Sequence, residues 1–154
     1  MPKVEFRNNG ILDSLTRAPA PSIFYSFLER EISIKAREDF NISIVTLRLT
    51  GISDDRQLMI GHAGLLRTLR KGDTYSRVAI SGFWILARAG FDEATEAAKR
   101  FCTSIEGAIL EDRRNYGSTQ EGGIKRFTIS SLVLTHKKGE SFSDFLDRID
   151  SQYF

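Results

Sequence analysis

The order in which hydrophobic periodicities follow one another constrains the fold more than any other feature of the chain. Apolar residues at three- and four-residue spacing predict helices, and runs that alternate apolar and β-branched residues predict strands. The expected elements are a helix from Pro21 to about Arg37, a strand over 41–49, a helix from Ser53-Asp54-Asp55 to near Gly72, strands over 74–80 and 83–87, a helix after Asp92, a strand over 127–134 and a helix after Ser141. After the first helix, this order is the split βαβ arrangement of ferredoxin-like α+β folds.

Local residue choices predict the ends and faces of these elements. Asp92 and Ser141 are expected to cap the third and fourth helices, and Ser53-Asp54-Asp55 offers a cap for the second. Ser81-Gly82 is expected to form the turn between the strands over 74–80 and 83–87, with the glycine at positive φ. The polar, glycine-containing segment 111–125 is expected to be a long mobile loop. The stripe expected to be buried on the second helix consists of Leu58, Met59, Leu65, Leu66 and Leu69.

Composition limits the classes of function open to the chain. Its 154 residues suit one domain, expected to span 1–154. With 22 Lys and Arg against 20 Asp and Glu, the protein is not expected to coat nucleic acid or an acidic membrane, so any anion site is local. Cys102 is the only cysteine, which excludes an intrachain disulfide and a multi-cysteine metal centre and fits a reducing compartment. Because no run of about 18 apolar residues occurs, we expect a cytoplasmic protein without membrane insertion.

Five short segments, in order along almost the whole chain, carry a resemblance to a known family. They are Asp13-Ser14-Leu15-Thr16, Phe24 with Phe27-Leu28-Glu29-Arg30-Glu31, Gly72-Asp73-Thr74-Tyr75-Ser76-Arg77, Phe127-Thr128-Ile129-Ser130, and Gly139-Glu140-Ser141 through Tyr153. In this order and spacing they resemble the GGDEF domain of diguanylate cyclases, a bacterial signalling family. The resemblance implies a nucleotidyl cyclase palm, in which helices pack on an antiparallel sheet built on the ferredoxin-like plan.

The signature motif of that family is degenerate here. Counted from Arg77, its five positions hold Ala79-Ile80-Ser81-Gly82-Phe83, and only the phenylalanine matches. In active members the acidic pair of the motif holds a metal and activates a 3′-hydroxyl, and none of these side chains replaces a carboxylate as a magnesium ligand. Arg48 stands where the resemblance implies the other metal carboxylate, and a cation there repels a divalent metal. We therefore expect no diguanylate cyclase activity, no catalytic residue, no metal site and no cofactor.

A second site of the family matches this sequence better. Many GGDEF domains bind their product through an Arg-x-x-Asp tetrapeptide that ends five residues before the signature. Arg70-Lys71-Gly72-Asp73 lies in that register, and Arg100 corresponds to the arginine that completes the site if one residue is deleted near Gly90. A guanidinium donates two hydrogen bonds to guanine O6 and N7 or to a phosphate. A carboxylate accepts from guanine N1–H and N2–H, which adenine does not offer.

These residue types fit cyclic di-GMP as the ligand, and they leave a structural alternative open. In that alternative Asp73 is only a turn residue, and Arg70 is a solvated cation in the last turn of a helix.

The remaining reactive side chains are expected to be structural. His62 has no ligand partner at i+3 or i+4, Cys102 lies on an apolar stripe, and Ser81 has no identifiable base. Arg77 is expected to pair with a nearby carboxylate and Trp84 to lie in the core. Arg113-Arg114 and Lys125-Arg126 are expected to be solvated loop charges, with anion contact as the alternative.

Two functions of different classes follow. The first is a non-catalytic receptor for cyclic di-GMP that signals to an unidentified protein partner, with a ligand-linked homodimer as a further expectation. The second is an interaction module that binds no nucleotide and uses the former active-site face or the 111–125 loop for docking. Residual GTP binding ranks third, and an active cyclase last.

Overall fold

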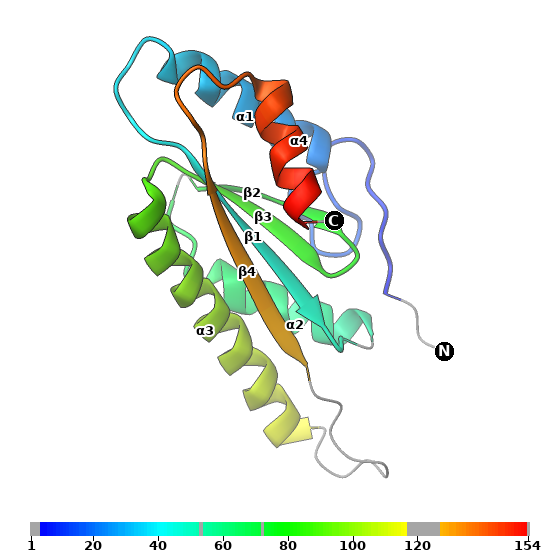
Figure 1. Cartoon of the computed structure of the whole chain (residues 1–154). Coiled ribbons are helices and arrows are strands. Elements are labelled where there is room, and N and C mark those ends of the chain that lie inside the picture. Colours follow the sequence, from blue (N-terminus) through cyan, green and yellow to red (C-terminus); the bar gives the residue numbers. More distant parts are fainter. Residues whose placement is uncertain (1–3, 53, 72, 117–126, 154) are drawn as a thin grey trace.

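A four-stranded antiparallel sheet in the order β2-β3-β1-β4 separates two layers of helices (Figure 1). The structure, a computed structural model, describes residues 4–52, 54–71, 73–116 and 127–153. The helices are α1 (Pro21–Lys35), α2 (Asp55–Leu66), α3 (Phe91–Tyr116) and α4 (Phe142–Tyr153), and the strands are β1 (Ser43–Thr50), β2 (Thr74–Ala79), β3 (Gly82–Ala87) and β4 (Thr128–Thr135). The predicted element order and α+β class are confirmed.

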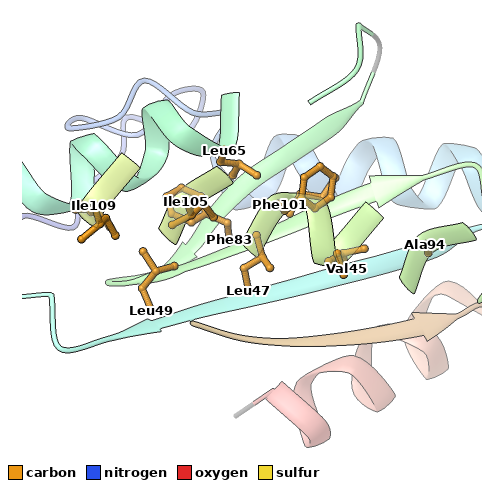
Figure 2. Packing of buried hydrophobic residues seen from close by; sticks show 12 residues of the cluster. Val45, Leu47, Leu49, Leu65, Phe83, Ala94, Phe101, Ile105 and Ile109 are labelled. Atoms are coloured by element: carbon orange, nitrogen blue, oxygen red, sulfur yellow. The ribbon is translucent and has the colours of Figure 1, made fainter. Parts of the chain in front are cut away.

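Two hydrophobic cores form because the sheet is covered on both faces. Helices α2 and α3 cover one face, and α1 and α4 cover the other (Figure 1). Successive residues of central strand β1 serve both cores, since side chains of a strand alternate between its faces. Ile44 packs with α1 and α4, while Val45, Leu47 and Leu49 pack against α2 and α3. Figure 2 shows these three β1 side chains pointing towards α3 residues that include Ile105 and Ile109.

Glycines share the contact face of α2 with Leu58 and Leu65. A Cβ on Gly64 would lie 2.8 Å from the carbonyl oxygen of Ser104 and 3.0 Å from Cα of Ile105, so α2 approaches α3 to near backbone contact. The Ser104 hydroxyl donates to the Gly64 carbonyl at 2.6 Å. This close packing turns the buried face towards the glycines, and Met59 and Leu66 are 38% and 46% exposed. Their predicted burial was wrong for that reason. The buried residues of α2 are Leu58, Gly61, His62, Gly64 and Leu65.

Several element ends differ from the prediction. Helix α2 ends at Leu66 instead of near Gly72, so Arg70 lies in the connection to β2 and not in a last helical turn. Helix α3 begins at Phe91, which places Asp92 inside the first turn instead of at the cap. The same helix continues to Tyr116, so 111–116 is helical, and the rest of the expected loop lies outside the described residues. Helix α3 is longer than predicted because its apolar stripe has a continuous partner in the sheet.

Other predicted ends are confirmed. The carboxylate of Asp54 accepts from the backbone N–H of Gln57 at 2.8 Å, and the Ser141 hydroxyl accepts from that of Asp144 at 3.0 Å. No helix among the described residues has the length and apolar character needed to cross a membrane.

Candidate functional site

The three residues of the expected nucleotide site line one small hollow. Arg70 and Asp73 come from the connection between α2 and β2, and Arg100 comes from the third turn of α3. They are brought together because α2 and α3 pack side by side and the connection runs past the start of α3. The other residues that line the hollow are Thr68, Ala87, Arg88, Ala89, Glu93, Ala97 and Phe101.

Asp73 is held in place by a turn that it closes itself. Its carboxylate Oδ2 accepts from the backbone N–H of Arg70 at 2.8 Å, and its own N–H donates to the Arg70 carbonyl at 3.0 Å. The structural role considered for Asp73 is therefore real. It does not exclude a binding role, because Asp73 also lines the hollow. The turn orients the acid, as a preformed ligand site requires.

The charges and dimensions of the hollow restrict what it can hold. Arginines at 70, 88 and 100 stand against the carboxylates of Asp73 and Glu93, a combination that suits a guanine edge and a phosphate. The volume is about 80 Å³, against about 300–1,000 Å³ for pockets that enclose a drug-sized molecule. One base edge or one phosphate fits inside, and the rest of a dinucleotide would lie outside the hollow.

Residues 79–83, where the signature was expected, form a hairpin that differs from the predicted one. The turn consists of Ile80-Ser81, and Gly82 is the first residue of β3, paired with Ala79 and Arg48. The glycine has no positive φ. It is required by packing, since a Cβ there would lie 1.6 Å from the hydroxyl oxygen of Tyr153. The space beside the fourth signature position is filled by the tyrosine of α4.

Arg48 belongs to the same packed group. Its guanidinium lies 4.5 Å from the centroid of the Tyr153 ring and donates to the Tyr153 carbonyl. A cation at the C-terminal end of α4 also complements the helix dipole. The position where a metal carboxylate was considered is therefore occupied by an arginine that anchors the last helix. Within the described ranges, no cluster of three His, Cys, Asp or Glu side chains forms a metal-ligand set.

A larger hollow of about 620 Å³ lies over this face. Its lining includes Phe6, Val78, Ile80 and Tyr153, and Arg48 is the only charged residue among the described lining residues. Phe6 and Ile80 are 38% and 53% exposed. The hollow offers apolar surface and no carboxylate to read guanine, so its chemistry favours a hydrophobic contact over a nucleotide.

Arg77 has the structural role predicted for it. Its guanidinium is buried and lies 3.1 Å from both carboxylate oxygens of buried Asp13, and it also donates to the carbonyl of Ile80 at 2.8 Å. Asp13 in turn accepts from the N–H and hydroxyl of Thr16, each at 2.8 Å. This network ties the N-terminal segment to the tip of the hairpin.

The other reactive residues are also part of the packing. His62 is 4% exposed and stacks between Tyr75 and Phe83, and burial lowers the pKa of its imidazole to about 4. Burial raises the pKa of the half-buried Cys102 thiol, which suits an inert residue. Trp84 is fully buried and Ser81 lies in the turn, as predicted. Arg113 is helical and stacks on Phe127, while Lys125-Arg126 lies outside the described residues.

Comparisons with known proteins establish the fold. No protein-family model and no curated protein sequence matches the chain. The GGDEF domain of DgcB from Caulobacter crescentus, in complex with c-di-GMP, matches with a TM-score of 0.69 and 16% identity, over 96% of this chain and 90% of that chain. The diguanylate cyclase SiaD from Pseudomonas aeruginosa, in complex with its activator SiaC, matches with a TM-score of 0.70 and 20% identity, over 91% of this chain and 55% of that chain.

A further match is a microbial GGDEF domain described by its interaction with bis-(3′,5′)-cyclic di-GMP. It has a TM-score of 0.68 and 17% identity, over 93% of this chain and 90% of that chain. The chain therefore has the α+β fold of GGDEF domains, as its motifs predicted.

Proposed function

We propose that the protein is a non-catalytic receptor for cyclic di-GMP that binds the ligand through Arg70, Asp73 and Arg100 and signals to a protein partner. The observation that carries this proposal is the convergence of the three side chains, from two separate segments, on one hollow. Two solved GGDEF domains of the same fold are described with c-di-GMP, one of them in complex with it. A guanidinium and a carboxylate that line one hollow suit the donor and acceptor pattern of a guanine edge.

The packing at the signature supports the absence of catalysis. A glutamate at position 82 needs space that the Tyr153 hydroxyl occupies, and Arg48 brings positive charge to the end of β1 where a metal would need acids. Incubation with GTP and magnesium is expected to give no cyclic di-GMP. Detectable synthesis by the purified protein would overturn this part of the proposal.

The small volume of the hollow also supports a ligand-linked dimer. Because about 80 Å³ admits only part of a dinucleotide, a second protein molecule or domain is needed to cover the remainder. Covering the ligand creates a new protein surface at the hollow, and the signalling partner recognises this surface.

Calorimetric titration with cyclic di-GMP tests the binding proposal. Arg70→Ala and Arg100→Ala are each expected to weaken binding about tenfold or more, because one bidentate contact to guanine is worth about 1–3 kcal/mol. Asp73→Asn keeps an oxygen to accept from the Arg70 N–H but adds a donor that faces the guanine donors, so it separates the turn role from the binding role.

The matched control is Arg67→Ala, in the same connection but outside the hollow. Its affinity is expected to equal that of the wild type. Absence of binding by the wild type, or unchanged affinity in Asp73→Asn and Arg70→Ala, would contradict the proposal.

A second candidate function rests on the 620 Å³ hollow over the former signature face. Its exposed Phe6 and Ile80 suit docking of a hydrophobic side chain of a partner protein. This alternative predicts no thermal stabilisation by any guanine nucleotide and loss of a stable partner complex in Ile80→Asp. Cyclic di-GMP binding at micromolar or lower concentration separates the two candidates in favour of the first.

A further inference from the structure

Arg88 lines the nucleotide hollow, and its guanidinium is paired with an acid of another helix. The residue directly follows β3, and it lines the hollow together with Arg70 and Arg100. Its guanidinium makes a two-pronged ion pair with Glu31 of α1, with Nε 2.6 Å from Oε2 and one terminal nitrogen 3.1 Å from Oε1. It also lies 4.3 Å from the centroid of the Phe40 ring.

The ion pair between Arg88 and Glu31 affects the net charge that the hollow presents to a ligand. Arg70 and Arg100 are matched by Asp73 and Glu93, and the positive charge of Arg88 is matched by Glu31. A cyclic dinucleotide brings two phosphates, and while Arg88 is paired with Glu31 the other charges of the lining, two arginines and two acids, offer them little net attraction. The arginine paired with Glu31 is the cation that can supply a net positive charge if it turns towards the ligand.

The ion pair is of the kind that a phosphate can displace. The side chain of Arg88 is 51% exposed, and ion pairs that water reaches contribute little net free energy. A phosphate presents the same bidentate acceptor geometry to a guanidinium as a carboxylate does. Rotation of the long arginine side chain exchanges one partner for the other, and it gives up the Phe40 contact and the pairing of a Glu31 side chain that is 18% exposed.

We propose that Arg88 is a third ligand-binding arginine of this hollow and that Glu31 competes with a ligand phosphate for it. The inference rests on the proposed binding of cyclic di-GMP. Because α1 packs on the opposite face of the sheet from α2 and α3, removal of Arg88 from Glu31 communicates ligand binding to the other helical layer. By linkage, any partner that neutralises Glu31 increases the affinity for the ligand.

Two substitutions with opposite expected effects test this inference in calorimetric titrations with cyclic di-GMP. Arg88→Ala is expected to weaken binding about tenfold, the loss of one charge-assisted contact. Glu31→Gln is expected to tighten binding about threefold or more, since it removes the competitor. In the double variant the tightening should disappear, because Glu31 acts only through Arg88. Arg88→Lys keeps the charge without the fork and is expected to recover part of the affinity.

The Arg56–Asp112 pair provides the matched control. It has the same two-pronged geometry, with side chains 58% and 13% exposed against 51% and 18% for Arg88 and Glu31. Asp112 lies twelve residues after Arg100 on α3, which places it about 18 Å along the helix axis. Asp112→Asn is expected to leave the affinity unchanged.

The outcomes separate this inference from the proposed function. Binding by the wild type that stays within twofold in both Arg88→Ala and Glu31→Gln overturns the inference and leaves the proposed function standing. Weaker binding by Glu31→Gln also overturns the inference. Absence of binding by the wild type overturns the proposed function and, with it, this inference.

Discussion

Substitution of Gly82 by alanine tests the packing between the β2–β3 hairpin and Tyr153. The added Cβ would lie 1.6 Å from the Tyr153 hydroxyl oxygen and 2.9 Å from Cζ, so the tyrosine ring has to leave its place. Tyr153 is 5% exposed, and its ring packs edge-on against Trp84 with the ring centroids 5.6 Å apart. The Arg48 guanidinium lies over the same ring. An aromatic side chain buries about 150–250 Å², which corresponds to about 4–6 kcal/mol at 25 cal/mol per Å².

Relaxation of the end of α4 recovers part of the burial free energy of the tyrosine. We therefore expect Gly82→Ala to lower the free energy of unfolding by about 3–5 kcal/mol, the range for truncation of a buried aromatic. Urea denaturation followed by circular dichroism measures the change. Tyr153→Ala should cost a similar amount, and the double variant hardly more than either single variant, because the tyrosine is already displaced in Gly82→Ala. The expected non-additivity is about 3 kcal/mol.

Gly107→Ala is the control for this series. Gly107 lies in α3, and a Cβ there meets no atom within 4 Å, so the substitution is expected to stabilise the protein by up to about 1 kcal/mol. A cost below about 1 kcal/mol for Gly82→Ala, or additive costs in the double variant, would refute the argument that Tyr153 dictates glycine at this position.

Three further predictions address stability and assembly. Arg77→Ala leaves the carboxylate of Asp13 buried without its cation, and should lower the free energy of unfolding by about 3–5 kcal/mol in urea denaturation. The pKa of His62 is about 4 in the folded protein, below its ordinary 6.5, so the unfolded chain takes up the proton first and stability should fall as the pH drops from 6.5 towards 4. Comparison of wild type with His62→Gln should show a difference of up to about 3 kcal/mol across that window, and identical pH profiles would contradict it. Light scattering after size exclusion should show a monomer alone and a dimer with cyclic di-GMP, and an unchanged mass would count against the ligand-linked dimer.

The fold followed from the sequence because it depends on patterns that are local. Hydrophobic periodicity and the caps at Asp54 and Ser141 predicted every helix and strand in order. The errors lie where a distant contact decides the local structure. Gly82 is required by Tyr153, 71 residues away along the chain, and the turn propensities of residues near Gly82 do not predict such a distant contact. Met59 is exposed because Gly64 sets how α2 meets α3.

The candidate site was predictable only in part. Arg70 and Asp73 were identified by the register of a tetrapeptide motif, and Arg100 by an alignment with one residue deleted near Gly90. The structure places all three at one hollow. Arg88 was missed because nothing in its own segment distinguishes it from a solvated arginine. Its proposed role follows from its ion pair with Glu31 of α1, a contact that only the three-dimensional structure shows.

The central claim is that this GGDEF fold, with Tyr153 and Arg48 packed beside Gly82, works as a receptor for cyclic di-GMP. The most direct measurement is a calorimetric titration of the intact protein with cyclic di-GMP, with cyclic di-AMP in parallel. The account predicts saturable binding of the guanine ligand and none of the adenine ligand, because the carboxylate of Asp73 accepts from donors that adenine lacks. Absence of heat with cyclic di-GMP, or equal affinity for both ligands, would contradict it.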